Sequence, residues 1–201
     1  MMADGVAISA AVEGIVDEAV ARTLILFAGG SPGPVYGKQG KPFLQQRICG
    51  YNTAAQHAPW IVLVDLDTDH NCAPMLCVSW LPQLASRLCF RVAVRAVEAW
   101  LLADAERIAA FLRISRSKVP ADPESLDNPK AAMVALARAS RRMDIREDMV
   151  PRDGSGRPVG PAYASRLIEF ASSAWRPQIA AQGADSLRRA IACLKHLAGT
   201  A

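Results

Sequence analysis

The first half of the chain alternates short apolar runs with longer segments of helical periodicity. The apolar runs cover 6–13, 60–66 and 89–97. Runs of this kind are typical of strands buried in a parallel sheet, and the periodic segments are typical of the helices that cover such a sheet. Helices are predicted over 14–29, 42–57, 75–88 and 98–112. The glycine-rich loop after the first helix has room for one more short strand, at 34–36.

The second half of the chain has no further strand pattern. Residues 129–144 and 163–198 show helical periodicity, and a loop rich in proline and glycine separates them. We therefore predict a mostly parallel α/β core over 1–112 and an α-helical C-terminal extension over 113–201, packed on that core. The chain of 201 residues is long enough for one such domain with an appendage.

Composition narrows the class of protein without naming a function. The chain is 51% hydrophobic and 21% charged, which is ordinary for a soluble protein. No apolar run is long enough to cross a membrane, and the N-terminus lacks the basic segment of a signal peptide. Five cysteines without regular spacing indicate reduced thiols, so we expect a cytoplasmic location. The net charge of +4 permits nucleic acid as a partner but does not require it.

Three aspartates follow the apolar run 61–64 at alternate positions: Asp65, Asp67 and Asp69. Side chains alternate along a strand, so Asp65 and Asp67 are expected on one side, about 6.6 Å apart. Two carboxylates this close repel each other unless a proton or a cation lies between them. Carboxylate oxygens suit Mg²⁺ or Mn²⁺, and the functional crevice of an open α/β sheet lies at the carboxyl ends of its strands.

Other interpretations of the same aspartates were weighed. A solvated turn is the simplest of them, because Asp and Asn are common turn residues. An EF-hand loop starting at Asp65 fails, because His70 and Leu76 stand where Gly and Glu are needed. A phosphoaspartate hydrolase stays a remote alternative, because Asp69 departs from its D-x-D-x-[TV] pattern. His70, Cys72 and Cys77 do not have the spacing of a zinc site.

Two glutamates stand at the ends of other predicted strands. Glu13 ends the first strand and is followed by Gly14, which would allow close approach of a backbone or substrate. Neighbouring parallel strands end at the same edge, so Glu13 could meet Asp65 and Asp67 across a crevice. Glu98 follows the strand 89–97 and opens a helix. Each glutamate could instead be an ordinary carboxylate at a helix start, where the helix dipole favours it.

Basic residues near the same strand ends are candidates for contacts with phosphate. They are Lys38, Lys41, Arg91, Arg95 and Lys130. A surface or ion-pair role is the alternative for each of them. The stretch around Lys38 is not a P-loop, because that template needs Gly where the chain has Pro32 and Ser or Thr where it has Gln39.

The motifs of the core resemble the TOPRIM domain. An apolar strand ending in Glu-Gly, within "VEGIVDEAV" at 12–20, is followed by an apolar strand ending in D-x-D, within "IVLVDLDTD" at 61–69. The stretches "RVAVRAVEAWLLAD" at 91–104 and "NPK" at 128–130 are similar to a narrower family of small bacterial TOPRIM-like proteins, related to the overcoming-lysogenization-defect nucleases. The resemblance implies a TOPRIM-type, Rossmann-like sheet.

The resemblance also implies a role for each matching carboxylate. Glu13 matches the glutamate that acts as general acid, general base or metal ligand. Asp65 and Asp67 match the pair that holds Mg²⁺, and Asp69 would extend this pair, with a water molecule as intermediary. Asp17 and Glu98 would support them. In TOPRIM nucleases such metals activate water and stabilise the phosphate under attack.

The function implied is Mg²⁺- or Mn²⁺-dependent cleavage of nucleic acid, with DNA favoured over RNA. Proteins of this kind often accompany an ATPase in phage-defence or mobile-element systems, and homo-oligomers are a further candidate assembly; we expect no membrane partner. A stand-alone topoisomerase is disfavoured, because none of Tyr36, Tyr51 and Tyr163 lies in a recognisable partner domain. Two alternatives stay open. One is an interaction subunit that kept the fold and lost catalysis, and the other is a hydrolase of small phosphorylated molecules.

Overall fold

The computed structural model describes residues 5–67 and 72–200. At its centre lies a sheet of four parallel strands in the order β2–β1–β3–β4. The strands are β1 (Ala7–Val12), β2 (Ser31–Gly37), β3 (Trp60–Asp65) and β4 (Leu88–Ala93). The prediction of a parallel α/β sheet is confirmed, and the short strand expected at 34–36 is a full strand at the edge of the sheet.

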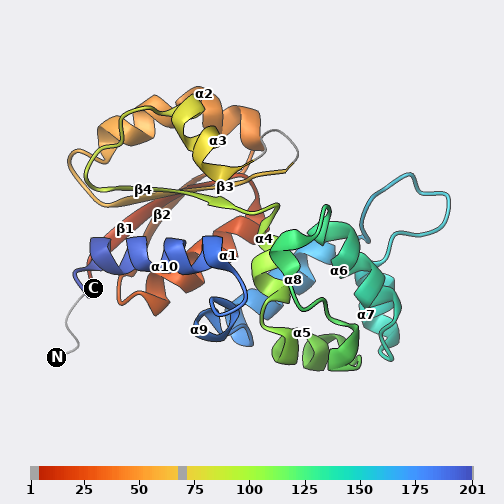
Figure 1. Cartoon of the computed structure of the whole chain (residues 1–201). Coiled ribbons are helices and arrows are strands. Elements are labelled where there is room, and N and C mark those ends of the chain that lie inside the picture. Colours follow the sequence, from red (N-terminus) through yellow and green to blue (C-terminus); the bar gives the residue numbers. More distant parts are fainter. Residues whose placement is uncertain (1–4, 68–71, 201) are drawn as a thin grey trace.

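Helices flank the sheet on both faces and gather beyond its carboxyl end (Figure 1). The first five are α1 (Ile15–Phe27), α2 (Lys41–Ala54), α3 (Ala73–Trp80), α4 (Val97–Leu102) and α5 (Ala105–Leu112). After the short turns η1 (Arg116–Lys118) and η2 (Pro123–Ser125) come α6 (Pro129–Arg138), α7 (Met143–Met149), α8 (Tyr163–Ser173), α9 (Pro177–Ala180) and α10 (Asp185–Ala198). Among the described residues, none of the helices has the length and apolar character that crossing a bilayer requires.

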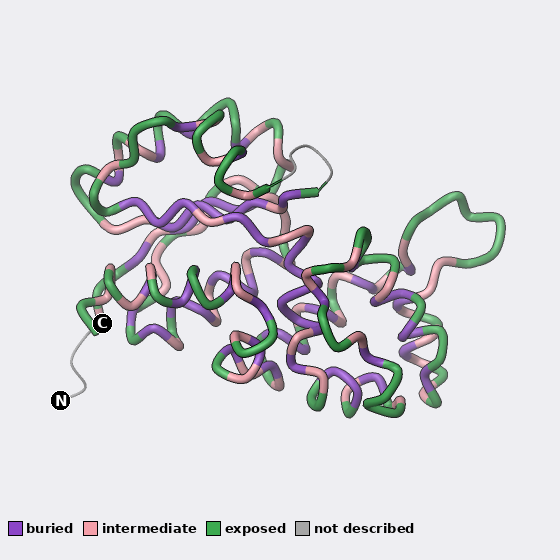
Figure 2. The backbone as a smooth tube through the Cα atoms, in the orientation of Figure 1, coloured by how far each residue is buried: buried purple, intermediate pink, exposed green. Residues whose placement is uncertain are grey.

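The two faces of the sheet are covered by different parts of the chain. Helices α2 and α3 cover one face, where Val62 and Val64 of β3 point. Helices α1 and α10 cover the other face, where Ile61 and Leu63 point. Figure 2 shows the strands as the most continuously buried part of the chain. Because α10 comes from the C-terminal helices, the extension completes the covering of the sheet.

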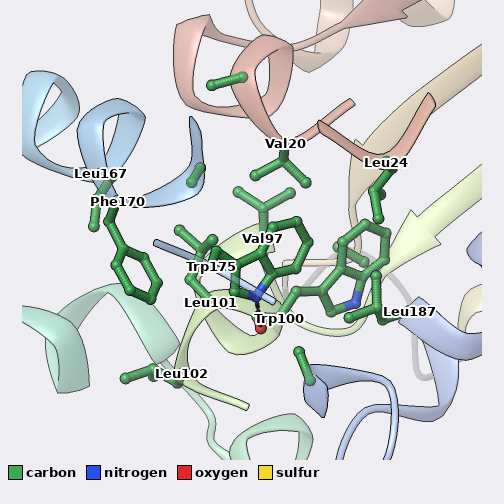
Figure 3. Close-up of a cluster of buried hydrophobic side chains, with 14 of the residues drawn as sticks. Val20, Leu24, Val97, Trp100, Leu101, Leu102, Leu167, Phe170, Trp175 and Leu187 are labelled. Atoms are coloured by element: carbon green, nitrogen blue, oxygen red, sulfur yellow. Dashed lines mark hydrogen bonds between the residues drawn. The ribbon is translucent and has the colours of Figure 1, made fainter. Parts of the chain in front are cut away.

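Trp100 joins the core of the sheet to the C-terminal helices. Its side chain is fully buried in the hydrophobic cluster of Figure 3, which draws residues from α1, α4, α8 and α10. The indole N–H donates to Ser186 Oγ at 2.7 Å, so burial of the ring leaves no polar group without a partner. The indole N–H of Trp175 donates to the carbonyl oxygen of Trp100 at 3.2 Å. These bonds fix α4 against α10 and the end of α8.

Three predicted helices are shorter than their periodicity suggested. The segment 98–112 forms two helices, because buried Asp104 caps α5 by accepting from the backbone N–H of Arg107. Asp104 also binds Arg176, with 3.0 Å to Nε, and so ties this break to the start of α9. The segment 75–88 ends as a helix at Trp80, two residues before Pro82. The segment 129–144 divides into α6 and α7.

Gly37 fixes the turn that leads from β2 towards α2. Its φ is +89°, and a Cβ atom there would lie 2.3 Å from the carbonyl oxygen of Val12 and 2.8 Å from Cδ2 of Leu44. No other residue fits this position. The next residue, Lys38, donates its backbone N–H to the same Val12 oxygen at 2.8 Å. The turn therefore holds the loop of Lys38 and Lys41 beside the end of β1.

Replacing Gly37 should destabilise the protein strongly. We expect Gly37→Ala to lower the free energy of unfolding by roughly 2–4 kcal/mol, through backbone strain and the clash with Val12. Gly50 is the matched control, because it lies inside α2 and a Cβ atom there would meet nothing within 4 Å. Gly50→Ala should raise the same free energy by roughly 0.5–1 kcal/mol. Urea titration of the three proteins measures both changes; equal stability of Gly37→Ala and wild type would contradict the steric argument.

Candidate functional site

Four carboxylates from separate elements come together at the carboxyl end of the sheet. Glu13 follows β1, Asp17 lies in the first turn of α1, Asp65 ends β3 and Glu98 lies in the first turn of α4. The backbone N–H of Asp65 donates to Glu13 Oε1 at 2.8 Å. The expected meeting of Glu13 and Asp65 across the strand ends is therefore confirmed. We call these four residues the carboxylate cluster.

Asp65 connects the sheet to the helix that carries Glu98. Its Oδ1 accepts from the backbone N–H of Val97, the first residue of α4, at 2.9 Å. The side chain of Asp65 thereby satisfies a helix N-terminus and holds it close to β3. Glu98 is the next residue, so this bond helps to place its backbone beside the end of β3.

Burial and mutual repulsion raise the proton affinity of the cluster. The pKa of Asp17 is raised from 3.8 to about 7, mainly by burial and next by the negative charge of Glu13. The pKa of Asp65 is raised well above its usual value, again mainly by burial and then by the charges of Asp17 and Glu98. Four like charges in so little solvent favour the uptake of a proton or a cation.

Two oxygen atoms of the cluster are buried without a hydrogen-bond partner among the described residues. They are Asp17 Oδ1 and Glu98 Oε2. Asp17 is 7% exposed and Glu98 is 3% exposed, so solvent reaches neither side chain freely. Buried acceptors of this kind are costly unless something binds them. These atoms mark where a cation or a substrate proton could be held.

Tyr163 is a member of the site that the sequence did not indicate. Its hydroxyl donates to Glu98 Oε1 at 3.2 Å, from the first residue of α8. The pKa of Tyr163 is raised by burial first and then by the charge of Glu98, so it stays a neutral donor. It lies 65 residues from Glu98, and no motif of the sequence connects the two.

Asp67 lies at the edge of the cluster and not where strand alternation placed it. The strand ends at Asp65, and Asp67 has a φ of +52°, so the expected alignment of the two side chains is wrong. Asp67 Oδ2 forms an ion pair with Lys41 Nζ at 3.0 Å, and the Asp67 side chain is 51% exposed. Asp69, the predicted outer ligand, lies outside the described residues.

Three of the five predicted phosphate contacts lie around the cluster. Lys41 Nζ reaches Asp67 and the carbonyl oxygen of Leu66, the latter at 3.2 Å. The guanidinium of Arg95 donates to the carbonyl oxygen of Asp67 at 2.8 Å. Lys130 Nζ lies 3.8 Å from Glu98 Oε1. The cluster is thus bordered by three cationic groups.

The other two predicted contacts are engaged elsewhere. Lys38 Nζ forms an ion pair with Glu18 Oε2 at 3.0 Å. Arg91 lies beside the thiols of Cys89 and Cys193. Burial raises the pKa of Cys89 well above its usual value, whereas the hydrogen bond with Cys89 and then the charge of Arg91 lower the pKa of Cys193 to about 6. Arg91 and Arg95 both line one hollow, but β4 ends at Ala93, so Arg95 lies beyond the strand that carries Arg91.

The residues of the cluster suit a hard divalent cation in kind. All four offer carboxylate oxygens, and two of these atoms are buried without partners. Within the described ranges, however, no three His, Cys, Asp or Glu side chains form a ready metal-binding group. Glu13, Asp17, Asp65 and Glu98 are the residues that could hold an ion after small side-chain adjustments.

Comparison with known proteins adds no assignment to this geometry. No family model matches the chain, and neither a curated protein nor a solved structure matches it.

The raised pKa of Asp17 predicts a stability that falls as pH rises. Folding raises the pKa of Asp17. Its contribution to the free energy of unfolding is therefore complete below the unfolded-state pKa of 3.8, and it is lost as the pH rises towards about 7. We expect the free energy of unfolding of Asp17→Asn to fall less steeply with pH than that of wild type. At pH 8 the variant should be more stable by on the order of 4 kcal/mol.

Denaturant unfolding at a series of pH values, without divalent cations, measures the effect. Glu169→Gln is the control, because it neutralises an exposed carboxylate outside the cluster. Parallel stability curves for wild type and Asp17→Asn would show that Asp17 is not the titrating group.

Proposed function

We propose that the protein is a Mg²⁺- or Mn²⁺-dependent nuclease of TOPRIM type that cleaves phosphodiester bonds of nucleic acid, with DNA favoured over RNA. The supporting observation is the carboxylate cluster, which brings buried Asp17 and Glu98 together with half-buried Glu13 and Asp65. The resemblance to TOPRIM domains supports two of these residues, Glu13 and Asp65, independently of their geometry. The ATPase partner, the phage-defence setting and homo-oligomer formation stay predictions.

The residues of the site divide between holding a cation and contacting the substrate. Glu13, Asp65 and Glu98 would hold the ion, and a bound Mg²⁺ or Mn²⁺ supplies an activated water and charge stabilisation at phosphorus. Lys130 and Lys41 border the cluster and would contact anionic phosphate oxygens. A charged phosphate near these lysines would compete with their present carboxylate partners.

Asp17 would transfer a proton, and Tyr163 would orient the carboxylate of Glu98. Asp17, with a pKa of about 7, exchanges its proton close to neutral pH, as a general acid or base requires. Tyr163 donates to one oxygen of Glu98 and leaves the other oxygen, Oε2, directed into the cluster. It is a positioning residue, because its contact is with Glu98.

A cleavage assay with wild type and two conservative variants tests the proposal. We expect wild type to nick plasmid DNA in Mg²⁺ or Mn²⁺ and to lose this activity in EDTA. Glu13→Gln and Asp65→Asn should each lower the rate at least about 100-fold. Glu169→Gln, which changes an exposed carboxylate on α8, should cleave as wild type does. The same assay with RNA decides between the two nucleic acids.

A second candidate function is an interaction subunit without catalytic activity. The observation that favours it is the ion pair between Lys41 and Asp67, which neutralises one half of the D-x-D pair. Calorimetry with Mg²⁺ and Mn²⁺ separates the candidates. Absence of both metal binding and cleavage would exclude the nuclease and leave this alternative. If wild type binds Mg²⁺ or Mn²⁺ and Glu13→Gln does not, the cluster holds the metal. That result would exclude an interaction subunit in which the cluster has only a structural role.

A further inference from the structure

The charge of the chain is unevenly divided between its two halves. Residues 1–112 contain eight Lys and Arg against ten Asp and Glu, whereas residues 113–201 contain fifteen against nine. The half that supplies all four residues of the carboxylate cluster is thus slightly acidic, and the helical extension is basic. A polyanion would be repelled by the first and attracted by the second. A site that cleaves a polyanion needs such a second surface to hold it.

Arginines of the extension gather on adjoining hollows of its surface. One hollow, of about 710 Å³, is lined by Arg138, Arg146 and Arg152. A second hollow shares Arg152 with the first and adds Arg157. Figure 1 shows the loop that carries the last two arginines projecting from the helices beyond α7, and Figure 2 shows the same loop as exposed.

Six exposed arginines of the extension have no side-chain partner within the described ranges, and two of them, Arg113 and Arg116, line neither of these hollows. Arg138, Arg141, Arg152 and Arg157 are exposed, and no hydrogen bond or ion pair within the described ranges engages their guanidinium groups. Other arginines of the extension form contacts within the protein. Arg142 and Arg166 bind Asp144, and Arg146 donates to the carbonyl oxygen of Ser140 at 2.6 Å. The paired arginines fix α7 against α8, which leaves the four exposed ones free to contact phosphate. We call these four residues the arginine track; Arg138, Arg152 and Arg157 line the two hollows, and Arg141, three residues after Arg138, lines another.

Helix α6 connects the arginine track to the carboxylate cluster. Lys130, in its first turn, lies 3.8 Å from Glu98, and Arg138 is its last residue. Eight residues of α-helix separate them by about 12 Å. The exposed positions between them are Ala131 and Ala135, whose small side chains project little from the helix. That distance corresponds to about three to four nucleotides of one strand.

The lining of these hollows indicates which form of nucleic acid fits. No aromatic residue lines either hollow. Proteins that bind single strands use aromatic side chains as platforms for unstacked bases. A surface that offers arginines and no aromatic side chains binds the phosphate backbone, with no reading of the bases. Acidic Glu147, Asp148 and Asp153 also line the first hollow, which limits how tightly it can bind.

We propose that the arginine track binds the backbone of a nucleic-acid duplex and directs one strand along α6 to the carboxylate cluster. The inference rests on the proposed function for its substrate class. The inference adds two points to that function: which surface holds the substrate, and that the substrate is a duplex. Because binding through phosphates does not require a divalent cation, it can be measured separately from cleavage.

The test is the binding of a fluorescein-labelled DNA duplex in EDTA, followed by anisotropy at several salt concentrations. The track variant combines Arg138→Ala, Arg141→Ala, Arg152→Ala and Arg157→Ala. The control variant removes the same charge from exposed arginines elsewhere: Arg47→Ala, Arg87→Ala, Arg188→Ala and Arg189→Ala. Thermal melting of both variants checks that they fold.

We expect the track variant to bind at least about 10-fold more weakly than wild type at 0.1 M salt. For this variant, the slope of log affinity against log salt concentration should be less steep by roughly 3–4, because each lost phosphate contact reduces the slope by about one. The control variant should bind within about twofold of wild type. Single-stranded DNA of the same length should bind more weakly than the duplex.

Three outcomes would overturn the proposal: no duplex binding by wild type, equal binding by the track variant and wild type, or equal losses in the track and control variants. The experiment also separates this proposal from the proposed function. Glu13→Gln should keep full duplex binding while it loses cleavage. Track-dependent binding by a protein that never cleaves would uphold the track and reject the nuclease.

Discussion

The confinement of four carboxylates, two at the ends of the adjacent strands β1 and β3 and two in the first turns of α1 and α4, is the constraint around which the rest of the site is built. The register of β1 and β3 sets Val12 opposite Leu63, so the residues that follow leave the sheet side by side. Glu13 then accepts from the backbone N–H of Asp65, and Asp65 accepts from the N-terminus of α4. These two bonds hold negative groups close together against their repulsion. Burial first, and this repulsion second, raise the pKa values of Asp17 and Asp65.

The C-terminal helices complete the site as well as the core. Tyr163 and Lys130 come from α8 and α6, and both reach the Glu98 carboxylate. The same helices are anchored by Trp100, whose ring is buried and whose indole N–H binds Ser186 on α10. The packing that stabilises the fold therefore also orients the groups around Glu98. Acidic strand ends and a basic helical surface then present opposite charges along one molecule.

Local patterns predicted the sheet because β1, β3 and β4 are short apolar runs that favour burial, whereas the edge strand β2 is not such a run. The meeting of Glu13 and Asp65 followed from the same reasoning, since parallel strands of one sheet end at one edge. The sequence misplaced Asp67, because alternation holds only within a strand and β3 ends two residues earlier. It also joined α4 and α5 into one helix, because the cap at Asp104 depends on Arg176 from a distant segment.

By itself the sequence determined the parallel α/β core, the helical extension and the carboxylates that meet at the strand ends. Each of these depends on contacts between neighbours in the chain or on rules that every parallel sheet obeys. Only the tertiary structure decided that Tyr163 donates to Glu98, that Lys41 neutralises Asp67 and that Arg91 lies with two thiols. These pairs are set by how helices pack against the sheet. Side-chain packing depends on the shape of the whole core, which no local stretch of residues encodes.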